Sequence, residues 1–199
     1  MLPPDFYQIQ HPGAHGLPKG TLYVQDQGDS IRFFVPGTDR QYLLDASRTT
    51  PLLFFRTQVD VDVFTIPFKV RPALGGVPPQ LNSNFNAALY LGRRTDIYSY
   101  RTKTIAAGLE TRQLRSRGLG YGLFGGIGSS TINELVTGGR VPFEYEGIIL
   151  DIGVAAIYDA RIFNVGLAAG ADNLMDSNRR YWIYHRRPWF GVLFGLNLN

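Results

Sequence analysis

The chain has no cysteine, and no run of 18 or more apolar residues occurs in its 199 residues. The absence of cysteine excludes disulfides, thiolate metal sites and cysteine nucleophiles. The absence of a long apolar run excludes a membrane-spanning helix, but in a membrane-spanning strand only every second residue has to be apolar. The first five residues lack the basic and apolar regions of a signal peptide, so either such a peptide has been removed or the protein is not exported.

The last strand-like stretch is the most informative part of the chain. Large apolar residues occupy every second position from residue 190 onward, and glycine or asparagine fills most of the positions between them. The apolar positions are Phe190, Val192, Phe194, Leu196 and Leu198, and the small or polar ones include Gly191, Gly195 and Asn197. A period of two predicts a strand. Glycine on the second face is typical of a narrow closed barrel with lipid outside and a crowded interior.

Period-two patterns elsewhere predict an all-β fold, an antiparallel closed transmembrane β-barrel of eight strands. Six strands are expected within residues 51–71, 84–92, 118–129, 147–158, 162–171 and 190–198, and a hairpin within residues 20–35 supplies two more. The alternation within residues 51–71 changes face once, which predicts a bulge near Val63. Residues 1–19 are proline-rich and are expected to form an extended leader, and residues 20–199 a single barrel domain.

The connections predict which end of the barrel faces outward. A tight turn at residues 159–160 is expected on the periplasmic side, and long connections at residues 72–83, 130–143 and 172–188 on the outer side. Residues 95–117 do not fit this asymmetry as a loop, but they fit if they extend the two flanking strands.

Three charged residues on the strands are predicted to face the lumen and to pair there: Lys69, Arg71 and Asp151. About eight strands leave an interior just wide enough to be filled by side chains, so no open pore is expected. Asp60 and Asp62 share one strand face and could hold a cation or act as a carboxylate pair. Solvation near the periplasmic end is the preferred interpretation.

Residues 178–189 form the densest basic and aromatic run. Such a run can bind single-stranded nucleic acid by stacking and phosphate pairing. The position of this run, just before the last strand, favours an interfacial girdle in contact with lipid head groups. The lipid-interface candidates are Arg179, Arg180, Trp182, Tyr184, Arg186, Arg187 and Trp189, and no nucleic-acid partner is predicted.

Two motifs could suggest a cofactor or catalysis. Residues 120–125 satisfy the dinucleotide-binding pattern G-x-G-x-x-G, but no helix is expected to follow them, as that chemistry requires. His185 lies near Asp172, Asp176 and Ser177 in sequence, so a hydrolase of the Ser-His-Asp type can be drawn. Serine and aspartate are common in loops because their side chains form hydrogen bonds that stabilise turns. We therefore predict no catalytic, cofactor-binding or metal-binding residue and no enzymatic activity.

Three segments resemble uncharacterised outer-membrane β-barrel proteins of Bacteroidetes-type bacteria: residues 62–72, residues 78–92, and residues 181–184 together with 188–199. The resemblance implies an exported barrel in a bacterial outer membrane, and it brings no activity or cofactor with it. The chain departs from many such barrels at its end, where Asn199 follows Leu198 in place of a terminal aromatic residue.

The sequence therefore predicts an outer-membrane barrel with a filled lumen and a structural, adhesive, small-ligand or lipid-binding role through its outer loops. Its expected partners are outer-membrane lipid and an envelope protein docked at the N-terminal segment. Three alternatives stay open: a soluble lipocalin-like barrel, a membrane-embedded lipid-modifying enzyme, and a subunit of a larger envelope assembly. The lipocalin alternative predicts the opposite polarity of residues 190–198, with the large apolar side chains inside.

Overall fold

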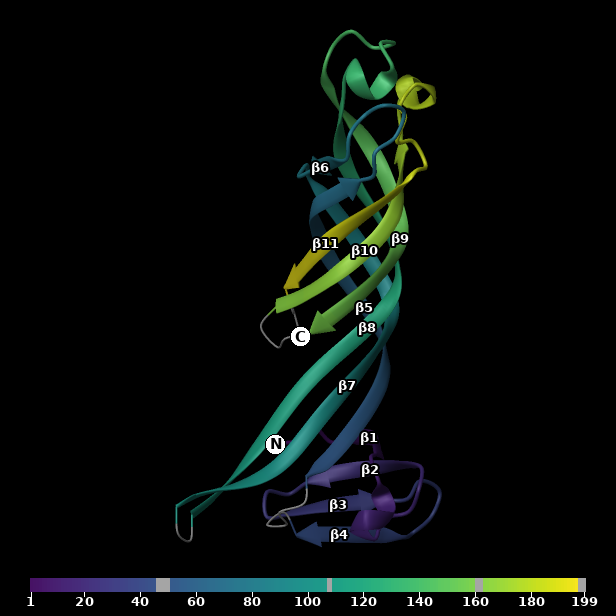
Figure 1. Ribbon diagram of the computed structural model, residues 1–199. Coiled ribbons are helices and arrows are strands. Elements are labelled where there is room, and N and C mark those ends of the chain that lie inside the picture. Colours follow the sequence, from purple (N-terminus) through teal and green to yellow (C-terminus); the bar gives the residue numbers. More distant parts are fainter. Residues whose placement is uncertain (46–50, 107–108, 160–162, 197–199) are drawn as a thin grey trace. The chain divides into compact units, whose positions relative to one another are not determined.

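The computed structural model describes residues 1–45, 51–106, 109–159 and 163–196. The fold is all-β, with 67% of the residues in strands and 6% in helices, and the strands form an antiparallel sheet (Figure 1). The strands are β1 Asp5–Ile9, β2 Thr21–Asp26, β3 Ser30–Phe34, β4 Gln41–Asp45, β5 Leu52–Arg71, β6 Gln80–Asn82, β7 Asn86–Ala106, β8 Leu109–Ile132, β9 Tyr145–Asp159, β10 Phe163–Leu174 and β11 Pro188–Leu196. Three short 3₁₀ helices complete the fold: η1 Pro12–His15, η2 Leu135–Thr137 and η3 Ser177–Arg180.

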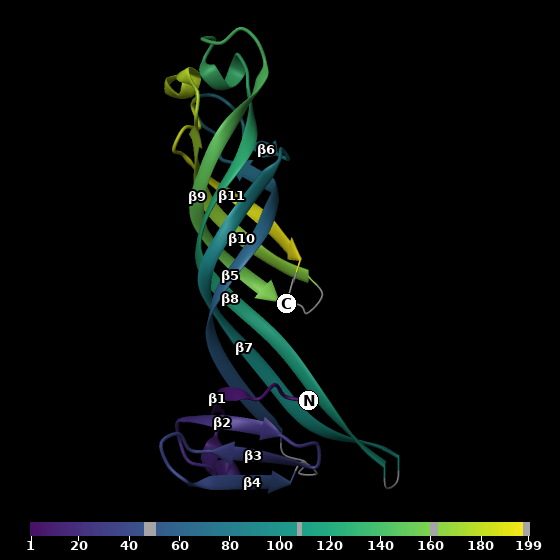
Figure 2. The ribbon, with the colours of Figure 1, turned by 180° about the vertical axis from the view of Figure 1, so that it is seen from behind.

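The chain divides into two compact units. Unit 1 comprises Met1–Gln58 and Thr95–Gly118, and unit 2 comprises Val59–Arg94 and Leu119–Asn199. Strands β5, β7 and β8 contribute residues to both units. Their length confirms that residues 95–106 and 109–117 extend the flanking strands, because β7 continues to Ala106 and β8 begins at Leu109 (Figure 2).

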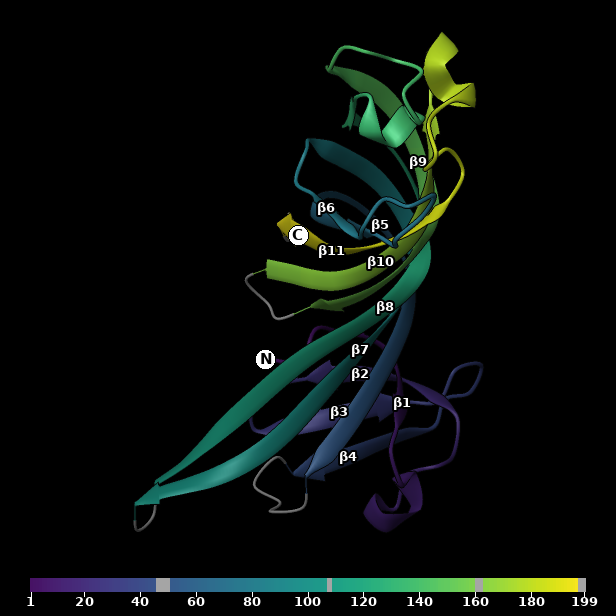
Figure 3. The same cartoon turned by 45° about the horizontal axis from the view of Figure 1, so that its top comes forward.

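Unit 2 contains a closed ring of six strands. Their order around the ring is β5, β7, β8, β9, β10 and β11, and β11 pairs back to β5 (Figure 3). The expected count of eight is not confirmed. The hairpin expected to supply the other two strands forms as β2 and β3, with Gly28 in the left-handed conformation at its turn. This hairpin pairs with β1 and β4 in unit 1 and does not enter the ring.

Unit 1 corrects the expected domain boundaries. Residues 1–19 do not form an extended leader, because β1 within them pairs with both β2 and β5. The alternating side chains Tyr7 and Ile9 are buried there, and Tyr7 packs edge-on against Phe54. The rest of this core is made of Leu2, Leu17, Leu22, Val24, Ile31, Phe33, Leu44, Leu52, Tyr98 and Tyr100. Residues 20–58 and 95–118 therefore belong to a compact unit separate from the ring.

The irregularity in β5 lies at Pro67 and not near Val63. Val192 of β11 pairs with Phe68, but Phe194 pairs with Thr65, so β5 has one extra residue between these two pairs. Proline has no N–H for the strand ladder, which explains why the bulge forms there. Its consequence is that Phe68 and Val70 face outward, while Lys69 faces the interior.

Candidate functional site

The outer surface of the ring forms an apolar belt, which Arg93, the exposed outward residue after Leu91, bounds on β7. On each strand the outward positions alternate with buried ones, and none of the outward positions within the belt carries a charge. The outward residues are Val59, Val61, Val63, Thr65, Phe68 and Val70 on β5; Ala87, Leu89 and Leu91 on β7; Leu119, Tyr121, Leu123, Gly125 and Ile127 on β8; Ile148, Leu150, Ile152, Val154, Ala156 and Tyr158 on β9; Val165, Leu167, Ala169 and Ala171 on β10; and Phe190, Val192 and Phe194 on β11. We call this set the apolar belt. A monomeric soluble protein rarely exposes an apolar patch of this extent.

The interior of the ring is packed and also contains charge. Its apolar part is a cluster of ten buried residues: Phe64, Ile66, Ala88, Tyr90, Phe124, Ala155, Ile157, Ala168, Trp189 and Leu193. Several glycines leave room for these side chains. A Cβ atom at Gly170 would lie 2.8 Å from Cζ2 of Trp189, closer than real Cβ atoms approach.

Two cations and two carboxylates form an ion-pair cluster inside the ring. Lys69 Nζ donates to Asp151 Oδ2 at 2.6 Å and to Asp172 Oδ1 at 3.0 Å. Arg71 Nη2 donates to the other oxygen of Asp172 at 2.6 Å. Strands β5 and β9 are not neighbours in the ring, so the contact between Lys69 and Asp151 crosses its interior. We call Lys69, Arg71, Asp151 and Asp172 the charge cluster.

Sequence reasoning predicted three of these four residues and missed Asp172. Asp172 was placed in the outer connection, but β10 continues through it to Leu174. The available signal was the period of two, because Ala168, Gly170 and Asp172 lie on the same strand face. The structure buries all four members of the charge cluster.

Three of the seven lipid-interface candidates are buried, which corrects their predicted role. Trp182, Tyr184 and Trp189 are exposed by 3%, 2% and 0%. The Lys69 ammonium lies 4.3 Å from the ring centre of Trp189, and the Arg71 guanidinium lies 5.1 Å and 5.6 Å from the rings of Trp182 and Tyr184. An indole or phenol face attracts a cation strongly when both are removed from water. These aromatic side chains therefore face the charge cluster and not a lipid surface.

The four arginines of the same run are exposed. Arg180 stacks over Tyr181 at 4.8 Å, and Arg186 Nε donates to Asn173 Oδ1 at 3.0 Å. Arg186 also has a left-handed backbone, with φ of 57°. All four arginines therefore place their cationic side chains on the connection between β10 and β11.

The two long connections that contain η2 and η3 pack together at one end of the ring (Figure 1). The N–H of Ile183 donates to the carbonyl of Val136 at 3.0 Å and joins the two connections. Their shared core is Ile132, Val136, Ile149, Leu174, Trp182 and Tyr184. We call residues 133–144 and 175–187 the loop cap. Tyr145 Oη donates to Asp176 Oδ2 at 2.6 Å, and burial together with this carboxylate raises the pKa of Tyr145.

A polar cavity of about 310 Å³ lies beside the loop cap. It is lined mainly by amide and hydroxyl side chains, with Arg71 of the charge cluster also in its wall; the polar lining residues are Arg71, Gln80, Asn82, Ser83, Asn84, Thr131 and Asn133. Asn84 Nδ2 donates to Thr131 Oγ1, and Thr131 Oγ1 donates to Glu146 Oε1. This lining fits a small hydroxylated or anionic molecule better than an apolar one.

Asp60 and Asp62 lie at the other end of the ring and are half-buried. Asn164 Nδ2 donates to Asp62 Oδ2 at 3.0 Å, and Arg94 pairs with Asp159. Within the described ranges, no group of three or more histidine, aspartate or glutamate side chains is arranged to hold a metal ion.

Three residues of the hypothetical Ser-His-Asp site, His185, Asp172 and Asp176, are engaged in other contacts. His185 Nδ1 accepts the N–H of Leu174 at 3.3 Å. Asp172 binds Lys69 and Arg71, and Asp176 Oδ1 accepts the N–H of Asn178. Burial lowers the pKa of the His185 imidazole below its usual 6.5, and the Arg186 and Arg179 charges lower it further.

The glycine motif at residues 120–125 lies inside the continuous strand β8, where no helix follows it. The described residues contain no helix that is both long enough and apolar enough to cross a membrane. No protein-family model, curated protein or solved structure matches this chain.

Proposed function

We propose that this chain is a β-barrel protein of a bacterial outer membrane whose six-stranded ring spans the hydrocarbon layer. The observation that carries the proposal is the polarity of the ring. Its outward positions form the apolar belt, whereas Lys69, Arg71, Asp151 and Asp172 are buried inside. A soluble β-barrel has the reverse arrangement. The exposure of Phe190 and Phe194, at 58% and 43%, speaks against the lipocalin alternative.

The height of the belt supports the same proposal. On β9 the belt runs from Ile148 to Tyr158, ten residue steps of about 3.3 Å, or about 33 Å along the strand. A strand tilted by about 40° would cover about 25 Å along the membrane normal, which is the height of the apolar band in outer-membrane barrels. Glu146, the exposed outward residue before Ile148, marks the polar limit of the belt at one end of this strand.

The charge cluster and the aromatic side chains around it support a filled lumen and a role other than conduction. A structural, adhesive or small-ligand role then falls to the outer loops, where the polar cavity of about 310 Å³ lies beside the loop cap. The resemblance to Bacteroidetes-type outer-membrane barrels is part of this proposal. Unit 1 is the proposed docking point for an envelope partner, because in the described residues β4 pairs only with β3 and leaves one edge open.

A charge introduced at the middle of the belt tests the proposal. Ile152→Arg places a cation near the midpoint of the belt on β9, where we expect a cost of about 2–4 kcal/mol on folding into lipid vesicles. Phe143→Arg is the matched control, since Phe143 is as exposed as Ile152, at 61% against 63%, but lies in the loop cap. Equal folding of both variants in lipid, or a wild-type chain that folds without detergent or lipid and ignores vesicles, would contradict the proposal.

A further inference from the structure

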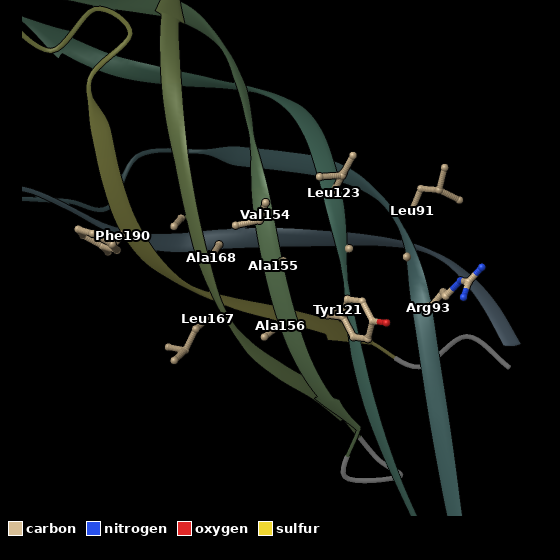
Figure 4. A pocket seen from close by; sticks show the side chains of 13 residues that line it. Leu91, Arg93, Tyr121, Leu123, Val154, Ala155, Ala156, Leu167, Ala168 and Phe190 are labelled. Carbon is tan, nitrogen blue, oxygen red and sulfur yellow. The ribbon is translucent and has the colours of Figure 1, made fainter. Parts of the chain in front are cut away.

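The apolar belt is not smooth, because a groove of about 690 Å³ crosses it (Figure 4). The groove lies wholly within unit 2 and is lined by residues of β7, β8, β9, β10 and β11. Small outward side chains form its floor, and large apolar ones form its walls. The lining side chains labelled in Figure 4 are Leu91, Arg93, Tyr121, Leu123, Val154, Ala155, Ala156, Leu167, Ala168 and Phe190.

The groove exists because two outward positions carry alanine where their neighbours carry large residues. Ala156 of β9 pairs with Leu167 of β10, and Ala169 of β10 pairs with Val154 on one side and Phe190 on the other. Gly92 and Gly122 continue the floor toward β7.

One end of the groove is polar. Arg93 is the next outward residue after Leu91 on β7, and it is exposed. Among the described residues it forms no ion pair, in contrast to Arg94, which pairs with Asp159. Figure 4 shows the phenol of Tyr121 on the same side of the groove as Arg93. A guanidinium and a phenol at the edge of an apolar groove suit a phosphate attached to a hydrocarbon chain.

We propose that this groove binds one acyl chain of an anionic phospholipid of the surrounding membrane, with the lipid phosphate on Arg93 and Tyr121. The inference rests on the proposed function, since it requires the ring to lie in a bilayer. The groove crosses five neighbouring strands, and four separations of about 4.8 Å give about 19 Å. One leaflet of the hydrocarbon core is about 15 Å thick, so a tilted acyl chain of one leaflet fits this length.

The experiment uses the full chain in nanodiscs of equimolar phosphatidylcholine and phosphatidylglycerol, with native mass spectrometry of the lipids that remain bound after release. We expect the wild-type chain to retain one phosphatidylglycerol. Arg93→Gln should lower the preference for phosphatidylglycerol over phosphatidylcholine about fivefold, the effect of one cation near an anionic surface. The double change Ala156→Leu and Ala169→Leu fills the groove and should abolish retention of both lipids. These side chains point outward, so the packed interior is unchanged.

The control variants are Arg140→Gln, which removes an exposed arginine of the loop cap, and Ala87→Leu, which enlarges an outward side chain of β7 away from the groove. Both should retain phosphatidylglycerol as the wild-type chain does. Equal retention by all variants, or a groove occupied by a second copy of the chain and seen as a dimer that the filled groove disrupts, would overturn the lipid assignment alone. A chain that does not enter the nanodisc at all would overturn the proposed function as well.

Discussion

Lys69 Nζ lies 2.6 Å from Asp151 Oδ2, and neither side chain retains any exposure to solvent. The two residues come from strands that are not neighbours in the ring. The contact between their side chains therefore spans the interior of the ring. Removing one partner of a buried ion pair leaves an uncompensated charge, whereas removing both can cost little.

Lys69→Met should therefore destabilise the protein by about 3–5 kcal/mol, because Asp151 loses its cation. The double change Lys69→Met and Asp151→Asn should recover a substantial part of that loss. The measurement is the free energy of unfolding in urea, in detergent micelles. Arg140→Gln serves as the exposed-charge control. A single variant as stable as this control would show that the pair does not stabilise the ring.

The packing of Trp189 predicts which glycines tolerate a side chain. At Gly170 a Cβ atom would lie 2.7 Å from the carbonyl oxygen of Ile152 and 2.8 Å from Cζ2 of Trp189. At Gly195 the nearest atom would be Cβ of Asn164, at an ordinary 3.5 Å. Gly170→Ala should cost about 1–3 kcal/mol through overpacking, and Gly195→Ala much less. Thermal unfolding of both variants measures the two losses of stability. Equal losses would show that the packing around Gly170 is no tighter than that around Gly195.

The charge cluster also predicts the behaviour of the protein in planar bilayers. A ring of this size has little interior space, and Lys69, Asp172 and Trp189 occupy part of it. We expect no stable porin-like conductance from the purified protein. Reproducible large channels would mean that the interior is open and that the buried ion pairs do not persist in lipid.

His185 predicts a loss of stability in acid. Its folded pKa lies below the usual 6.5 because of burial and the Arg186 and Arg179 charges. Between the lowered pKa and 6.5 the unfolded chain therefore binds more protons than the folded one, so stability falls as the pH falls through this window. His185→Gln should reduce that dependence. The unfolding free energies of both proteins, followed from pH 7.5 to pH 5, test it, and identical pH profiles would contradict it.

How far the sequence predicts this structure depends on whether a segment has a regular period. The alternation after Phe190 predicted both the strand β11 and its outward face, and the same rule placed Lys69 and Asp151 inside. The bulge was misplaced because the side-chain pattern allowed a change of face anywhere between Val63 and Phe68. Only Pro67, which lacks a backbone N–H, indicates where in this range the bulge lies.

Segments without a period were predicted less well. Trp182 and Tyr184 lie in a connection, where an amphipathic aromatic side chain can face lipid or a buried cation equally well, and only the fold brings Arg71 beside them. The N-terminal strand β1 was missed because prolines on both sides concealed the alternation of Tyr7 and Ile9. The division into two units was also missed, although the sequence carries a signal for it. Residues 93–117 contain nine charged residues, whereas residues 84–92 and 118–132 contain none, and the boundaries between the units lie at these changes in charge.

The most direct test of the proposal that the ring spans a membrane uses the absence of cysteine from the chain. Single cysteines placed at Ile148, Leu150, Ile152 and Val154 of the belt, and at the exposed Phe143 of the loop cap, can each carry an environment-sensitive fluorophore in vesicles. Lipids brominated along their acyl chains should quench the four belt positions, most strongly at Ile152 and Val154, and should spare Phe143. Quenching of the outward positions by aqueous iodide, with no effect of the brominated lipids, would contradict the account.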